Sequence, residues 1–170
     1  SRRQLSNGRM VVSLGAGGIS QIAFRGVNLL GRGGIGLHLR HDSTDTWTFH
    51  TDRWAQPIAA RLGRGAWQVE EHGPFRARVR MEARLRNSGV TWTIGLYDRE
   101  PRVEMELVVN FDERFTLLQM PIRLAEPASR RADGIAGGHV SRPAASPTEW
   151  PFLGWSRLRV GKTDIGLVTN

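Results

Sequence analysis

The feature that most constrains the fold is a strictly alternating run over residues 75–86. Successive side chains of a β-strand point to opposite faces, so a long strand with one buried and one solvated face produces this alternation. At the helical period the same apolar residues would scatter around the helix axis. The apolar members are Phe75, Ala77, Val79, Met81, Ala83 and Leu85, and the polar members are Arg76, Arg78, Arg80, Glu82, Arg84 and Arg86.

Two further alternating runs follow over residues 90–96 and 103–111, and turn residues separate the three runs. The pattern predicts a three-stranded antiparallel meander with one face on the core. On its outer face we expect arginines of the first strand to lie near Glu104 and Glu106, across the middle strand. Such ion pairing explains several arginines without a ligand.

Shorter strand signals cover most of the remaining chain, which predicts an all-β fold with little or no helix. We expect residues 1–170 to form a single β-sandwich domain. The sequence stops directly after a predicted strand, so we expect a fragment of a longer enzyme, truncated at its C-terminal end. The segment 125–147 is expected to be irregular. The predicted strands cover residues 9–14, 19–24, 35–39, 57–62, 66–71 and 116–124, with a final hairpin of 155–160 and 165–169.

Composition limits the classes of function. The chain has no cysteine, which excludes a disulfide framework, a thiolate metal site and a cysteine nucleophile. No stretch approaches the roughly 20 apolar residues of a membrane helix, so we expect no membrane partner. The opening residues carry no secretory signal, and we therefore expect a cytoplasmic location.

The net charge of +8 has two interpretations. All basic residues except Lys162 are arginines, which is typical of a GC-rich coding genome. The alternative is a surface that binds a polyanion such as nucleic acid. Such a surface usually clusters its charges with interleaved aromatics, whereas these arginines are spread along the chain and many lie near acidic residues. A nucleic-acid partner is therefore not expected.

The segment 41–54 gathers carboxylates, histidines and large aromatics, and it supplies four candidate substrate-binding residues, Asp45, Trp47, Asp52 and Trp54. Sugars are bound by such mixtures, because an aromatic face stacks on C–H groups while polar groups bond hydroxyls. A carboxylate pair could also serve a glycosidase as acid and base. The alternative is structural: the aromatics plug one end of the sandwich and the aspartates cap turns.

Other motifs carry weaker signals. The histidines lack the ligand spacing of a zinc site and the aspartates lack that of an EF-hand loop, so we expect no metal. The glycine-rich segment 31–36 has neither the Lys-Ser/Thr nor the following helix of a phosphate loop. His139 is a lone histidine in a polar segment, where exposure is the ordinary outcome.

Several segments in order resemble the C-terminal domain of glycoside hydrolase family 38, the retaining α-mannosidases. They span nearly all of the chain. Residues 7–12 and 18–22 resemble the family's entry hairpin, and Asp45-Thr46-Trp47 resembles its D-A-W-D loop. Gly73-Pro74-Phe75-Arg76-Ala77 is similar to the G-P-x-R-A start of a long strand, and residues 113–122 are similar to the strand E-x-R-K-x-L-K-x-x-F-P. Residues 137–143 resemble the motif F-G-H-x-x-R-P, and Trp155 with residues 166–170 resembles the W and the G-x-A-L-L-N that follow it.

The resemblance implies an antiparallel β-supersandwich of the galactose-mutarotase-like kind. It adds His139 and Arg142 to the candidate substrate-binding residues. The family's zinc ligands and nucleophilic aspartate lie in a separate N-terminal barrel, which nothing in this chain resembles. We therefore expect no catalytic residue and no cofactor in this fragment, although the parent enzyme would use zinc. The expected partners are the catalytic domain of the same polypeptide and mannosides.

Three functions remain open from the sequence. The first is the non-catalytic β-domain of an α-mannosidase-like hydrolase, which supports the catalytic barrel and lines the sugar site. The second is a stand-alone carbohydrate-binding module that uses the same residues. The third is an arginine-rich β-protein that binds a polyanion.

Overall fold

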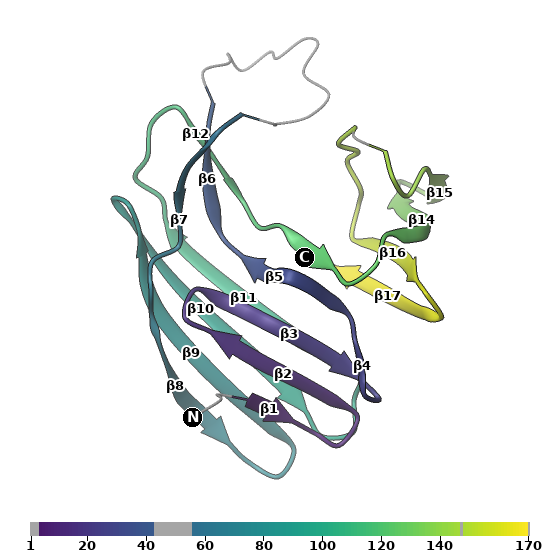
Figure 1. The fold of residues 1–170 in the computed structure, drawn as a ribbon, viewed down its shortest axis with the longest axis horizontal. Coiled ribbons are helices and arrows are strands. Elements are labelled where there is room, and N and C mark those ends of the chain that lie inside the picture. The colour runs from purple at the N-terminus through teal and green to yellow at the C-terminus, as the bar shows by residue number, and fades with distance from the viewer. Residues whose placement is uncertain (1–3, 43–55, 147, 170) are drawn as a thin grey trace.

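The computed structural model describes residues 4–42, 56–146 and 148–169. These residues form strands that pair antiparallel throughout, and they contain no helix (Figure 1). The predicted all-β sandwich is therefore confirmed. Within the described residues no helix is long and apolar enough to cross a membrane.

The first sheet has the strand order β1-β2-β3-β5-β13, and β4 also pairs with β3. It contains the predicted hairpin of β2 and β3, which turns at Ala16 and Gly17. The bounds are β1 Gln4–Ser6, β2 Met10–Gly15, β3 Gly18–Phe24, β4 Val27–Asn28, β5 Leu30–Gly36 and β13 Ile122–Leu124.

The second sheet has the order β11-β10-β9-β8 and contains the predicted meander. Trp92 of the central strand β10 lies opposite Met81 of β9 and Leu107 of β11, so these apolar side chains share one face. The bounds are β8 Ala66–His72, β9 Arg76–Leu85, β10 Ser88–Tyr97 and β11 Val103–Asn110.

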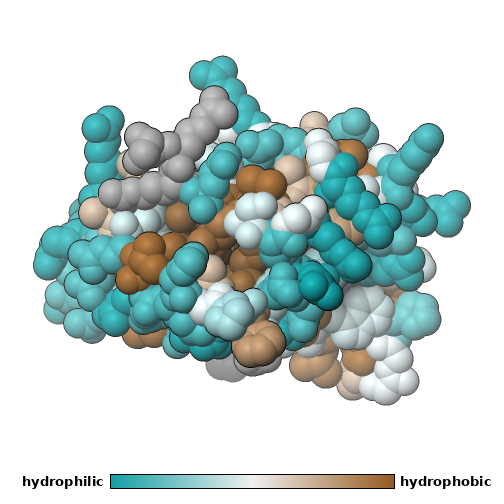
Figure 2. Space-filling model, turned by 90° about the horizontal axis from the view of Figure 1, so that it is seen from below, coloured by the Kyte–Doolittle hydropathy of each residue, from teal (hydrophilic) through white to brown (hydrophobic). Residues whose placement is uncertain are grey.

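The two sheets stack face to face around one apolar core (Figure 1). Val12 and Ile19 of the first sheet belong to the same buried cluster as Met81 and Trp92 of the second. Figure 2 shows the molecule from below, and on the side turned to the viewer apolar side chains lie in the middle, flanked by polar side chains. Burial of this apolar area is the main favourable contribution to folding.

The outer face of the meander carries the expected ion pairs. Arg78 Nη2 lies 3.0 Å from Glu106 Oε2, across the central strand, and Arg80 Nη2 lies 2.7 Å from Glu82 Oε1. The Arg78–Glu106 contact confirms the expected pairing across the central strand. Arg80 pairs instead with an acid of its own strand, and Glu104 pairs with Arg102 at 3.5 Å.

Phe75 departs from the predicted pattern. It was expected on the buried face, but its side chain is 80% exposed and β9 begins one residue later, at Arg76. The Phe75 carbonyl accepts a hydrogen bond from the Asp98 amide (2.8 Å). This contact places Phe75 in the turn region at the end of the sheet, beyond the apolar residues that would cover its ring.

The third sheet has the order β12-β6-β7. Its bounds are β6 His38–His41, β7 Ile58–Arg61 and β12 Thr116–Gln119. The predicted strand over 116–124 is divided into two, because the chain breaks at Met120 and Pro121, and the two halves, β12 and β13, join different sheets. Each half is an edge strand, which agrees with the edge or bulge that Pro121 predicts. A proline lacks the amide hydrogen that a continuous ladder needs, which accounts for the break.

The fourth sheet has the order β15-β14-β16-β17 and lies to one side of the stacked sheets (Figure 1). Its bounds are β14 Ala128–Ile135, β15 Gly138–Arg142, β16 Trp155–Val160 and β17 Thr163–Val168. The final hairpin is as predicted. The expectation of an irregular segment over 125–147 is wrong, because β14 and β15 form a hairpin there. Its turn residue Gly137 has a φ of 75°, which only glycine adopts without strain.

Candidate functional site

The sequence-predicted site residues fall into two groups. Asp45, Trp47, Asp52 and Trp54 lie in the segment 43–55, outside the described residues. His139 and Arg142 lie on β15. The candidate residues that the structure describes therefore lie on the fourth sheet.

His139 and Arg142 are three residues apart on one strand, so their side chains point to opposite faces of the fourth sheet. The pairing confirms this, since His139 lies opposite Gly134 and Arg142 lies opposite Arg131. The structure thus does not bring the two predicted residues together. We call the side with His139 the outer face and the side with Arg142 the inner face.

A buried carboxylate organises the inner face. Asp133 of β14 is 0% exposed. Its Oδ1 accepts hydrogen bonds from Arg131 Nε (2.9 Å) and from the Ser156 hydroxyl (2.7 Å). Its Oδ2 lies 2.8 Å from Arg131 Nη2 and 3.0 Å from Arg142 Nε. These two Oδ2 contacts are close in distance but lack hydrogen-bond angles, so charge attraction holds them.

The strand register explains how these side chains meet. Arg131 and Asp133 are two residues apart on β14 and therefore share a face. Ser156 of β16 lies directly opposite Asp133, and Arg142 of β15 lies directly opposite Arg131. Neighbouring side chains on one face of a sheet are within reach of each other.

The ionisation of Asp133 follows from these contacts. Burial by itself raises the pKa of the carboxyl group. The hydrogen bonds from Arg131 and Ser156, together with the charges of Arg131 and Arg142, outweigh burial, and the pKa is lowered below its ordinary value. The group is therefore a carboxylate at neutral pH and can hold a guanidinium.

Arg142 contacts both this carboxylate and the segment that follows β15. Its guanidinium carbon lies 4.7 Å from the centre of the Trp150 ring, within cation–π range. Its Nη2 donates to the Pro151 carbonyl (3.3 Å). The Trp150 indole donates weakly to Ser146 Oγ (3.4 Å) and remains 38% exposed. An exposed indole beside guanidinium donors suits a ligand with both apolar and hydroxyl surface.

The outer face carries a second aromatic group. The Trp155 ring lies beside His139, with 6.2 Å between ring centroids. A Cβ at Gly134 would come within 2.8 Å of Trp155 Nε1, so glycine is needed there for the indole to lie across β14. Trp155 is partly exposed, and it offers a stacking surface without a neighbouring buried charge.

Sequence reasoning missed Asp133, Arg131, Ser156 and Trp150. The available signal was the two-residue spacing of Arg131 and Asp133, which places both on one face of any strand. The small and polar residues of 125–147 favour an irregular segment, and this obscures the spacing signal.

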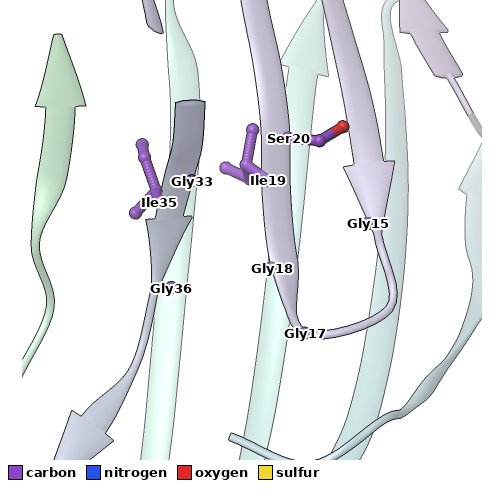
Figure 3. A pocket seen from close by; sticks show the side chains of 8 residues that line it. All are labelled: Gly15, Gly17, Gly18, Ile19, Ser20, Gly33, Ile35 and Gly36. Atoms are coloured by element: carbon purple, nitrogen blue, oxygen red, sulfur yellow. The ribbon is translucent and has the colours of Figure 1, made fainter. Parts of the chain in front are cut away.

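The glycine-rich segment 31–36 contributes to a different feature. A hollow of about 290 Å³ lies along β3 and β5, lined mostly by glycines with Ile19 and Ile35 (Figure 3). Ser20, its polar side chain, donates its hydroxyl to the Ser13 carbonyl (3.0 Å). A Cβ at Gly18 would collide with the Ile35 carbonyl, and one at Gly34 with the Ile19 carbonyl. These glycines therefore serve the close approach of two strands.

The described part of the chain lacks a cluster of metal ligands. Residues 4–42, 56–146 and 148–169 contain no group of three His, Cys, Asp or Glu side chains that could hold a metal ion.

Comparison with known protein families gives a match over most of the chain. The family described as the glycosyl hydrolases family 38 C-terminal domain matches residues 6–156. The match covers the stacked sheets and the fourth sheet up to the start of β16. No curated protein matches this sequence.

Proposed function

The chain belongs to the glycoside hydrolase family 38 C-terminal domain family, and from this membership we propose that it is the non-catalytic β-domain of an α-mannosidase-like hydrolase. In this role the stacked sheets support the catalytic barrel of the same polypeptide. The inner face of the fourth sheet, with Arg142 and Trp150, lines one side of the sugar site.

The observation that carries the proposal is the family match over residues 6–156. The geometry of Arg142 and Trp150 supports the sugar-lining part. A guanidinium donates to neighbouring hydroxyls through its fork of N–H groups, and an indole packs on the C–H face of a hexose. Both groups are present side by side, 4.7 Å apart.

In this proposal the catalytic barrel of the parent polypeptide carries out the hydrolysis. The family resemblance implies a zinc ion and a nucleophilic aspartate in a separate barrel. The described residues of this chain do not provide a ligand set for that zinc.

The coding sequence on both sides of this chain is the first test. We expect an upstream segment that encodes a barrel with a His-x-Asp motif and a further catalytic aspartate. A flanking sequence without such a barrel contradicts the proposal.

The activity of the full-length polypeptide is the second test. We expect hydrolysis of an aryl α-mannoside, and we expect Arg142→Ala to lower kcat/KM by roughly 10- to 100-fold, the value of a charged hydrogen bond. Arg99→Ala is the matched control, because Arg99 is highly exposed and pairs only with its neighbour Asp98 at 3.3 Å in the described structure. Equal activity of the Arg142 variant and the control contradicts the sugar-lining role.

A stand-alone carbohydrate-binding module is the second candidate, and the partly exposed indoles of Trp150 and Trp155 favour it. Its test is a titration of the protein with mannobiose at millimolar concentration, followed by NMR. This function predicts shifts of the two indole N–H signals and of amides in residues 45–54. A spectrum that does not change rejects it.

A further inference from the structure

The group of Asp133, Arg131, Ser156 and Arg142 holds more positive charge than its carboxylate requires. Arg131 alone contacts both oxygens of Asp133, through Nε at 2.9 Å and Nη2 at 2.8 Å. The Nε contact is a hydrogen bond, and the Nη2 contact is held by charge attraction, so Arg131 already serves as the counterion of Asp133. Arg142 is therefore a second cation on a carboxylate that already has its partner, and the group has a formal charge of +1.

Arg142 is also poorly hydrated. Its side chain is 15% exposed, and removing a charged group from water is costly unless it is paired. Apart from Asp133, the guanidinium contacts the Pro151 carbonyl and the Trp150 ring.

In the described structure the Arg142 guanidinium makes one charge contact, one hydrogen bond and one ring contact. Nε faces Asp133 at 3.0 Å, Nη2 donates to the Pro151 carbonyl at 3.3 Å, and the plane lies over Trp150. In the part of the chain that the structure describes, its Nη1 amino group has no hydrogen-bond acceptor. The planar fork is thus held from one side, and donors on the other side remain available to a ligand.

A comparison within the same sheet isolates the role of burial. On the outer face Asp164 also contacts two arginines, Arg157 at 2.8 Å and Arg159 at 3.0 Å. There the side chains are half-exposed, no aromatic ring covers either guanidinium in the described structure, and water can stabilise each charge. The inner group differs in being buried and in directing one arginine towards an exposed indole.

We propose that Asp133 is a positioning residue that holds the guanidinium of Arg142 beside Trp150, so that the pair binds adjacent hydroxyl groups of a hexopyranoside. The inference rests on the proposed sugar-lining function and extends it to a residue that does not touch the ligand. Preorganised donors bind a ligand better, because ordering them on binding carries no further cost.

Chemical rescue gives the sharpest test. In the full-length polypeptide, Arg142→Ala removes the guanidinium. Added guanidinium at millimolar concentration should raise the kcat/KM of this variant for an aryl α-mannoside at least tenfold over its value without the ion. The added guanidinium ion needs the Asp133 carboxylate to hold it in place. We therefore expect no rescue in the double variant Asp133→Asn with Arg142→Ala.

The matched control is the double variant Asp164→Asn with Arg142→Ala, in which the outer carboxylate is removed and rescue should persist. A residue that only stabilises the sheet would not control rescue by a small ion. Rescue of both double variants to the same extent overturns the inference.

A double-variant cycle supplies the second readout. Asp133→Asn alone should lower kcat/KM by roughly 10- to 100-fold, as misplacement of a binding group does, mainly through KM. Combining it with Arg142→Ala should add little, because both changes remove the same interaction. If Asp133→Asn does not fold, Asp133→Glu keeps the charge and displaces it by one methylene, with the same expectation.

Crystal structures of the variants separate the two proposals. In Asp133→Asn we expect the Arg142 guanidinium to leave its place 4.7 Å from the Trp150 ring. An unmoved guanidinium overturns the positioning role and leaves the proposed function standing. Unchanged activity of Arg142→Ala overturns the sugar-lining function and, with it, the inference.

Discussion

Met81 and Arg80 are neighbours on β9 with opposite surroundings. Met81 is fully buried opposite Trp92, whereas Arg80 is exposed and pairs with Glu82. Met81→Asp places an unpaired charge in the core and should lower the free energy of unfolding by about 4 kcal/mol or more. Arg80→Asp loses a surface ion pair and should cost about 1 kcal/mol or less. Thermal unfolding measures both, and equal losses would show that the face assignment is wrong.

Asp133 should make the stability of the protein depend on pH in the acid range. Its pKa is lower in the folded protein than in the unfolded chain, so its ionised form stabilises the fold. This stabilisation is complete above the unfolded value of roughly 4 and is lost as the pH falls through the folded pKa. We expect the melting temperature of the wild type to fall more steeply between about pH 5 and pH 2 than that of Asp133→Asn. Asp164, whose pKa is also lowered, chiefly by its hydrogen bond from Arg157, titrates in both proteins. Parallel curves would contradict the expectation.

At the scale of elements, Glu113 holds the hairpin of β9 and β10. Its side chain is 2% exposed, and one oxygen accepts from the Asn87 amide (2.8 Å), the Ser88 amide (3.2 Å) and the Ser88 hydroxyl (3.0 Å). Glu113→Ala leaves these donors without their acceptor and should lower the free energy of unfolding by about 2 kcal/mol or more. Amide hydrogen exchange should accelerate at Asn87 and Ser88. Glu106→Ala, which removes an exposed partner of Arg78, is the control and should leave both amides unchanged.

The elements that the sequence predicts correctly are those whose alternation is sustained. The meander follows from side-chain period alone, because a strand with one buried face repeats every two residues. The hairpin of β14 and β15 was missed because its faces do not separate into apolar and polar sets. Asp133 is buried there as a charged residue. Its neighbours Ser156 and Arg142 belong to other strands, and only the strand register brings them to it.

The candidate site shows the same limit. Motif resemblance identifies Arg142 and His139, but it cannot show that they lie on opposite faces of one sheet unless β15 is first recognised as a strand. Trp150 lies eight positions beyond Arg142, outside any strand, and its stacking depends on how the intervening segment folds back. Contacts of this kind follow from tertiary structure and leave no periodic signal.

Across the whole molecule the apolar core is unevenly distributed. The buried cluster is built from the first three sheets together with Leu29 and Leu37, which lie between strands. Of the fourth sheet only Ile165 packs against it, as a partly buried residue, in the described structure. The fourth sheet instead has Asp133 and its partners on its inner face. Regions with few buried apolar contacts open locally at lower free energy than the core.

Native-state hydrogen exchange should therefore divide the molecule into two regions of different stability. We expect the slowest amides in β9 and β10, around Met81 and Trp92, and faster exchange throughout β14–β17. Asp133→Asn should accelerate exchange in β14–β17 alone, because it leaves two arginines without their buried carboxylate and does not touch the apolar core. Met81→Ala should instead accelerate the core amides, since the cavity costs roughly 2–5 kcal/mol of global stability. If Asp133→Asn changed exchange equally in both regions, the fourth sheet would be part of one cooperative unit with the sandwich, and the role of Asp133 would extend beyond its own sheet.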